Sequence, residues 1–163
     1  MPFGGNLRGN KNGSALIRII FLVYAAVMLW LLFGQRVGEE GITVHFGISN
    51  ENLNLLPLKT VKLYLWLLQN STNEALLRHA VINLIGNVVL FIPFGWFLPY
   101  IWANLRSFFK TTLAVLLLIS AVEIVQYFTQ LGSCDVDDLI LNLVGALTGY
   151  LLWKIGAHRR SKK

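Results

Sequence analysis

Charged residues are scarce in this chain of 163 residues, at 13%, against about 25% in soluble domains. Cysteine occurs once, at Cys134, so no intramolecular disulfide can form and the fold does not depend on oxidation. Apolar residues take the place of charge: 55% of the chain is hydrophobic, and its mean hydropathy is +0.60. This balance excludes an ordinary soluble domain and indicates an integral membrane protein.

The net charge of +6 comes from 14 basic and 8 acidic residues. No basic patch alternates with aromatic residues, so nucleic acid is not an expected partner. The basic residues instead follow the bias toward cytoplasmic loops, which predicts a multi-pass protein of the cytoplasmic membrane with both termini inside. The ten that then lie on the cytoplasmic side are Arg8, Lys11, Arg18, Arg106, Lys110, Lys154, Arg159, Arg160, Lys162 and Lys163.

Four apolar segments are long enough to cross a bilayer, which takes about 20 residues of helix. A cleaved signal peptide is the alternative for the first, but no small-x-small cleavage site follows it. Pro93 and Pro99 are expected to kink or interrupt the second. The prediction is an all-α membrane domain at 14–155 with helices at 14–34, 80–103, 111–131 and 138–155, between a disordered cytoplasmic tail at 1–13 and a basic cytoplasmic tail at 156–163.

The long polar connection at 35–79 contains one further helical pattern, at 57–69. Its apolar and basic positions separate onto different helical faces, and two lysines make a further span improbable on energetic grounds. We expect an amphipathic helix that lies in the membrane interface of the first extracytoplasmic loop. The residues that form this pattern are Leu58, Val61, Leu65 and Leu68 on one face and Lys59, Lys62 and Trp66 on another.

Glu123 is the charge placed deepest in an apolar segment. A carboxylate in hydrocarbon costs about 2.5–3.5 kcal/mol on insertion scales, so it should face a cavity, a partner or the protein interior. Other polar residues fall at similar depth in the outer leaflet, although asparagine and glutamine could simply join helices at about 0.6 kcal/mol per hydrogen bond. We predict a ligand-binding site that opens away from the cytoplasm and is lined by Asn83, Asn87, Glu123, Gln126, Asp135, Asp138 and Asn142.

Two alternatives use the same acids for chemistry. Glu123, Asp138 and His79 are the candidates for a catalytic acid or base, but no Ser-His-Asp order or phosphate-binding glycine loop accompanies them. Asp135, Asp137 and Asp138 could hold a divalent cation through oxygen ligands. Against that, Asp138 is placed to cap the last span, where an acid favours the helix dipole. No cofactor is predicted.

Small residues in the spans permit close approach between helices, as in small-xxx-small patterns. A small transporter or assembly partner would need several copies of the chain, and the glycines of the last span could then form the interface between them. The four packing candidates are Gly86, Gly95, Gly145 and Gly149.

The segments NLIGNVVLFIPFGWFLP, EIVQ and DVDDLILNLVGALTGY, together with NLNLLPL, resemble the VanZ family of small bacterial membrane proteins, named for a teicoplanin-resistance accessory protein. The likeness covers nearly all of 50–150. It implies lowered susceptibility to teicoplanin-type lipoglycopeptides without rebuilding of the peptidoglycan precursor. The family positions that match here are Asn87, Pro93, Gly95, Glu123, Gln126, Asp135, Asp138, Asn142, Gly145 and Gly149.

The resemblance leaves two physical routes for a protein of this kind. A binding protein would engage the antibiotic or the lipid-linked precursor, whereas an enzyme would use the acids on an envelope lipid or glycan. Membrane lipids are partners in either case. One departure affects the site: relatives commonly carry an arginine shortly before the aspartates, where this chain has Gly132-Ser133-Cys134.

Overall fold

The computed structural model of the chain describes residues 11–34, 53–129, 131 and 133–161. Four of its helices are long and apolar enough to cross a membrane, which confirms the predicted all-α membrane fold. The elements in chain order are α1 (Lys11–Leu29), the π-helical turn η1 (Trp30–Gly34), β1 (Leu53–Asn54), α3 (Lys59–Asn70), α4 (Glu74–Ile101), the 3₁₀ turn η3 (Ala103–Arg106), α5 (Phe108–Thr129), β2 (Cys134–Asp135) and α6 (Val136–Ser161).

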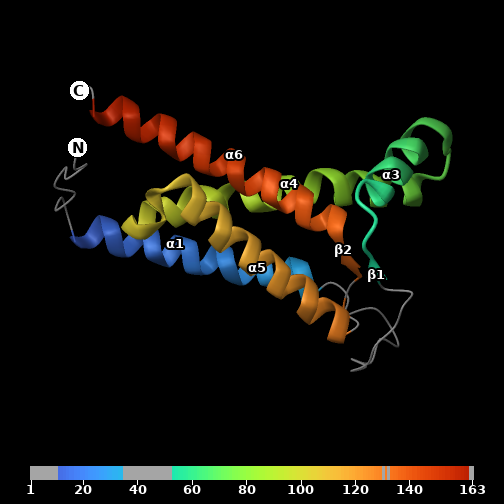
Figure 1. Ribbon diagram of the computed structural model, residues 1–163, viewed down its shortest axis with the longest axis horizontal. Coiled ribbons are helices and arrows are strands. Elements are labelled where there is room, and N and C mark those ends of the chain that lie inside the picture. The colour runs from blue at the N-terminus through green and yellow to red at the C-terminus, as the bar shows by residue number, and fades with distance from the viewer. Residues whose placement is uncertain (1–10, 35–52, 130, 132, 162–163) are drawn as a thin grey trace.

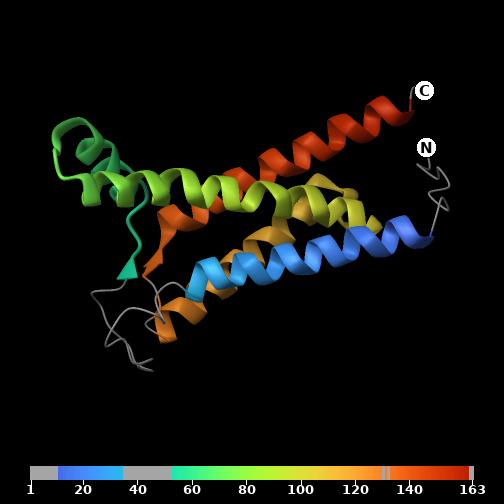
Figure 2. The ribbon, with the colours of Figure 1, turned by 180° about the vertical axis from the view of Figure 1, so that it is seen from behind.

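The long helices run side by side and the chain alternates in direction along the bundle (Figure 1). At one end lie α3, the two short strands and the starts of α4 and α6, and we call this the α3 end. At the opposite end, the basic end, lie the start of α1, the turn η3 and the end of α6. Figure 2 shows α1 beside α4 on the far face. Both described ends of the chain therefore lie at the basic end.

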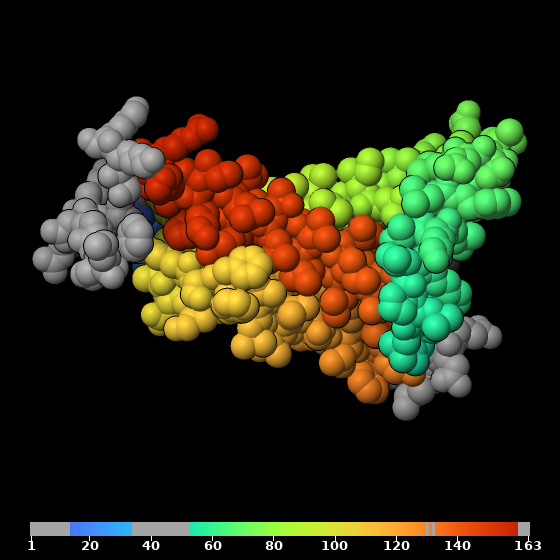
Figure 3. All heavy atoms as spheres, turned by 45° about the horizontal axis from the view of Figure 1, so that its top comes forward, coloured from blue at the N-terminus to red at the C-terminus, as the bar shows by residue number. Residues whose placement is uncertain are grey.

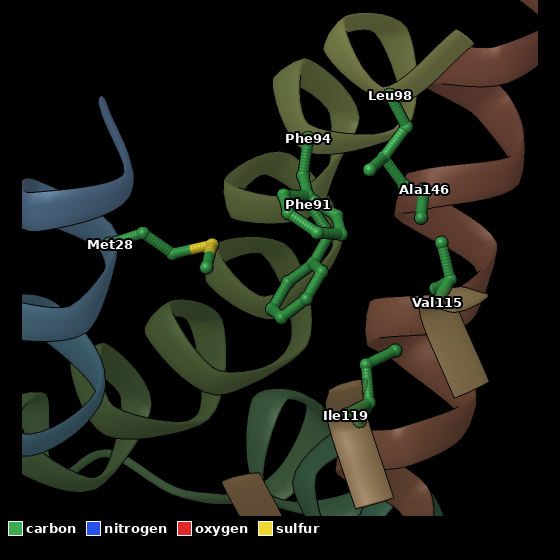
Figure 4. Close-up of a cluster of buried hydrophobic side chains, with 7 residues drawn as sticks. All are labelled: Met28, Phe91, Phe94, Leu98, Val115, Ile119 and Ala146. Carbon is green, nitrogen blue, oxygen red and sulfur yellow. The ribbon is translucent and has the colours of Figure 1, made fainter. Parts of the chain in front are cut away.

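The apolar core lies where α4 meets the other three long helices (Figure 4). Phe91 and Phe94 point from α4 toward Met28 of α1. Their two rings pack edge to face, with 5.9 Å between the ring centroids. The hydroxyl of Tyr24 donates a hydrogen bond to the carbonyl oxygen of Leu90, which adds a polar link between α1 and α4. The other core residues are Leu98, Val115, Ile119 and Ala146.

Three glycines allow α4 and α6 to approach until their backbones touch. A Cβ atom on Gly145 would lie 2.1 Å from the carbonyl oxygen of Val88, and one on Gly149 would lie 1.9 Å from that of Ile92. Gly95 meets α6 in the same way. Any side chain at these positions would clash with a backbone, so the glycines of the last span serve contacts within one chain and do not offer the interface between copies that we considered.

Gly86 differs from these three glycines. A Cβ there would meet Ile82 of its own helix at 3.8 Å, an ordinary van der Waals contact. The expected role of Gly86 in close helix approach therefore finds no counterpart in the structure.

The second predicted span begins earlier than expected. The side chain of Asn73 accepts hydrogen bonds from the backbone N–H groups of Ala75 and Leu76, so it caps α4 and starts the helix at Glu74 instead of residue 80. The helix also continues through Pro93 and Pro99 without interruption, as packed membrane helices allow.

The last helix is longer than predicted at both ends. It starts at Val136 instead of residue 138 and continues to Ser161, through most of the segment expected to be a tail at 156–163. No proline stops it, and Arg159 and Arg160 suit a helix C-terminus because cations there favour the helix dipole. The tail predicted at 1–13 lies mostly outside the described residues.

Candidate functional site

The buried carboxylates among the described residues lie at the α3 end. Glu123 in α5, Asp135 in β2 and Asp137 in α6 are 5%, 6% and 0% exposed. The side chain of Glu123 accepts the backbone N–H of Asp135 at 3.0 Å, which joins the third span to the start of the last one. Carboxylates buried in this way are stabilised by charge-assisted hydrogen bonds from N–H donors.

Asp135 caps the last helix. Its Oδ1 accepts the backbone N–H of Asp137 at 2.8 Å and the side-chain amide of Asn54 at 3.1 Å, while its Oδ2 accepts the hydroxyl of Thr60 at 2.5 Å. The prediction that Asp138 caps this helix is therefore wrong by three residues. The helix begins directly after Asp135, so Asp135 is the residue whose side chain reaches the first unpaired N–H groups.

Asp137 caps a different helix from the one that carries it. Its carboxylate accepts the backbone N–H groups of Leu58, Thr60 and Val61, the last two at 2.7 and 3.0 Å. Leu58 stands before the first turn of α3 with φ 63°, and its own side chain provides no cap. A carboxylate at a helix N-terminus satisfies unpaired donors and favours the helix dipole. Asp137 thus fastens the first turn of α3 to the start of α6.

A short backbone pairing reinforces this contact. Leu53 and Asn54 pair in parallel with Cys134 and Asp135, as strands β1 and β2 of two residues each. In Figure 3 the segment that leads into α3 lies against the start of α6 and covers it from outside. The segment 53–61 is therefore the part of the described chain that closes the α3 end over the carboxylates.

A second polar group lies next to this closed cluster, between α4 and α6. The side-chain amide of Asn87 donates to Oδ1 of Asp138 at 2.6 Å, and both residues are half-buried. Asn142 follows one helical turn deeper, on the same face as Asp138, and is 1% exposed. Its Oδ1 is buried without a hydrogen-bond partner in the described part of the chain. Such an orphaned acceptor costs about 1–3 kcal/mol.

The remaining predicted residues are engaged elsewhere. Nε2 of His79 lies 3.2 Å from the hydroxyl of Tyr64 and 3.2 Å from the side-chain amide of Asn83, so this group joins α3 to α4 on an exposed surface. Gln126 donates to the backbone oxygen of Leu32 in the π-helical turn at 3.0 Å. Both contacts join helices, and neither is a contact with the carboxylates.

A family model described as VanZ/LLP1 matches residues 21–157 of the chain. The chain belongs to this family. It is also similar to Protein VanZ of Enterococcus faecium, with 28% identity over 152 residues, which cover 93% of this chain and 82% of that protein. No solved structure matches the chain. The family match includes every contact described above at the α3 end.

In this VanZ-family chain two of the three aspartates of the run, Asp135 and Asp137, are engaged in structural hydrogen bonds. Among the residues that the structure describes, no group of three or more His, Cys, Asp and Glu side chains is placed to hold a metal ion. Asp135 and Asp137 direct their oxygens to N–H and O–H donors instead. Glu123, Asp138 and Asn142 are the residues of the cluster that do not take part in holding α3.

The thiol of Cys134 lies close to two carboxylates of the VanZ-family site, and they affect its pKa. Burial, and then the negative charges of Glu123 and Asp135, raise the pKa of its thiol above the ordinary value. Glu123 and Asp135 thus disfavour the thiolate form of Cys134, as nearby negative charges do.

Sequence patterns did not reveal two of the residues that build this end. Asn54 and Thr60 lie in a polar connection, and their hydrogen bonds to Asp135 cross 81 and 75 positions of sequence. Capping is normally recognised from residues within the same first turn. The resemblance of NLNLLPL to the VanZ family pointed to the stretch that holds Asn54, and the helical pattern at 57–69 included Thr60, but neither signal indicated a contact with Asp135.

Proposed function

We propose that this chain lowers susceptibility to teicoplanin-type glycopeptides by binding the antibiotic or the lipid-linked cell-wall precursor at the α3 end. Membership of the VanZ family supports the drug class. The polar group of Glu123, Asp138 and Asn142 supports the location, because hydrogen bonds between the helices do not account for all of its buried polar atoms.

The observation that carries this proposal is the orphaned Oδ1 of Asn142. A buried acceptor without a donor costs stability, and an apolar residue at this helix position would avoid that cost. A donor from a ligand, direct or through one bridging water, would satisfy the oxygen. The half-buried Asn87 and Asp138 would form the outer part of the site and Asn142 its inner end.

The chemistry of the site suits ligands rich in hydrogen-bond donors. The carboxylates and the Asn142 carbonyl oxygen are acceptors, and an ionised carboxylate cannot donate. Glycopeptides and lipid-linked precursors present amide N–H groups and sugar hydroxyls, which match such acceptors. A lipid anchor would keep the precursor at the depth of the site.

The distribution of charge supports the orientation that this proposal requires. The basic end carries Arg18, Arg106, Lys110, Lys154 and Arg159 among the described residues, and the carboxylates lie at the α3 end. Lysine and arginine favour the cytoplasmic side of membrane proteins. The α3 end would then face the outside of the cell, where glycopeptides and the exported precursor are found.

Binding is favoured over catalysis by the same contacts. Asp135 and Asp137 have their oxygens occupied by structural donors, and His79 bonds to Tyr64 and Asn83. An acid-base pair needs a proton donor and acceptor that both reach the reacting atoms. The described contacts support one polar binding group better than such a pair.

The test is Glu123→Gln in a teicoplanin-sensitive bacterial host. We expect the variant to insert at wild-type abundance and to lose the protection that the wild type confers. Glu74→Gln is the matched control, because it removes a carboxylate that is exposed at the start of α4. Full protection by Glu123→Gln at equal abundance would show that Glu123 is structural and would refute the proposal.

A further inference from the structure

Arg18 introduces a positive charge into the first span. The apolar segment of this span is Ser14–Phe33, so Arg18 lies four residues inside it, about 6 Å along a helix. A charge at this depth must extend toward the headgroups or meet a partner. Arg18 forms no hydrogen bond or ion pair with the described part of the chain.

No acidic side chain is available near it in the residues that the structure describes. The basic end holds the start of α1, and the carboxylates all belong to elements of the opposite end. The described acids are Glu74, Glu123, Asp135, Asp137 and Asp138. A negative charge that pairs with Arg18 must therefore come from outside the described part of the chain.

The structure has a cleft at this position. It measures about 350 Å³ and lies between the first half of α1 and the end of α4. Arg18 is its one charged lining residue, and Phe21, Leu22, Ile101 and Trp102 form the rest. The ring centroids of Phe21 and Trp102 lie 5.4 Å apart with an interplanar angle of 83°, so this aromatic pair joins α1 to the end of α4. The cleft thus combines one cation with an apolar, partly aromatic wall.

We propose that this cleft binds the headgroup of an anionic phospholipid. The lipid phosphate pairs with the guanidinium of Arg18, which is suited to two-point recognition of phosphate. The indole of Trp102, which is 43% exposed, supplies an N–H donor at the membrane interface, where tryptophan is favoured.

The apolar surroundings fit the rest of such a lipid. Leu22, which lines the cleft, and its neighbour Val23 are 65% and 60% exposed on α1, so they offer an apolar surface for an acyl chain. The volume of the cleft suits a lipid headgroup and the first carbons of its acyl chains. The rest of the acyl chains would then lie along α1. This site is at the opposite end from the glycopeptide or precursor site and does not depend on it.

The experiment is native mass spectrometry of the full chain released from nanodiscs that contain equal parts of phosphatidylglycerol and phosphatidylcholine. We expect the wild type to retain phosphatidylglycerol preferentially. Arg18→Gln should lower that retention at least fivefold, and Arg18→Lys should restore part of it. The matched control is Lys154→Gln, which removes one charge from the same end but does not line the cleft.

Three results would overturn the proposal. Equal retention of the two lipids by the wild type would show that the cleft has no charge preference. Equal losses in Arg18→Gln and Lys154→Gln would assign the effect to the general positive charge of this end. Displacement of phosphatidylglycerol by millimolar inorganic phosphate would assign the cleft to a soluble phosphate.

Discussion

Asp137 of α6 holds the first turn of α3 through the backbone N–H of Thr60, 2.7 Å from its Oδ2, although 77 positions separate the two residues. This relationship changes the interpretation of the aspartate run. Three acids in four positions suggest metal or catalytic chemistry, yet Asp135 and Asp137 cap the starts of two helices. The binding group that we propose is correspondingly smaller, and it consists of Glu123, Asp138 and Asn142.

Asp137→Asn should destabilise the protein strongly. The two oxygens of Asp137 together accept three backbone N–H groups, and the substitution replaces one of these oxygens by an NH₂ donor. It also removes a charge that favours the α3 dipole. We expect a loss of about 3 kcal/mol in unfolding free energy, since hydrogen bonds to charged groups contribute about 1.5–3 kcal/mol each. Thermal unfolding in detergent measures it, with Glu74→Gln as the control. Equal melting temperatures for the two variants would contradict the cap.

Gly145→Ala tests the contact between α4 and α6. The added Cβ would lie 2.1 Å from the carbonyl oxygen of Val88, which belongs to a helix backbone and cannot move locally. We expect about 3 kcal/mol of destabilisation or failure to accumulate in the membrane. Gly156→Ala is the control on the same helix, because a Cβ added there would meet nothing within 4 Å. The control should be neutral or slightly stabilising, and similar behaviour of both variants would refute the close contact.

The reactivity of Cys134 should depend on the carboxylates beside it. Because the folded pKa of the thiol is raised, the thiolate fraction near neutral pH is smaller than for a free cysteine, and alkylation is slow. The rate should rise with pH and should rise further in Glu123→Gln, which removes one of the negative charges. Maleimide labelling between pH 7 and 10, followed by mass spectrometry, gives both comparisons. Slower alkylation of Cys134 in Glu123→Gln than in the wild type would contradict the predicted effect of the Glu123 charge.

Orientation can be tested independently of any ligand. Green fluorescent protein fused after residue 163 should fluoresce, and alkaline phosphatase fused there should be inactive, because the basic end is expected in the cytoplasm. A fusion of phosphatase after Ser71, between α3 and α4, should be active. The reverse pattern would place the carboxylates inside the cell and would remove the basis for binding exported precursors.

The membrane fold could be predicted from the sequence because apolar segment length is a local property. The positions of Glu123 and Asn142 were also informative, since a polar residue in an apolar helix must be explained by something nearby. The docking of 53–61 could not be predicted, because it depends on Asp135 and Asp137 reaching a segment more than 70 positions away. Helix ends were misplaced where caps decided them, as at Asn73 and Asp135.

The most direct test of the proposed site is Asn142→Leu, measured for both thermal stability and teicoplanin protection. Leucine has the same branching and the same number of side-chain heavy atoms as asparagine, but it lacks the orphaned acceptor. If Asn142 is kept for binding, the variant should melt at the same temperature as the wild type or higher, and should lose protection at equal abundance. Full protection by Asn142→Leu would contradict the proposed site.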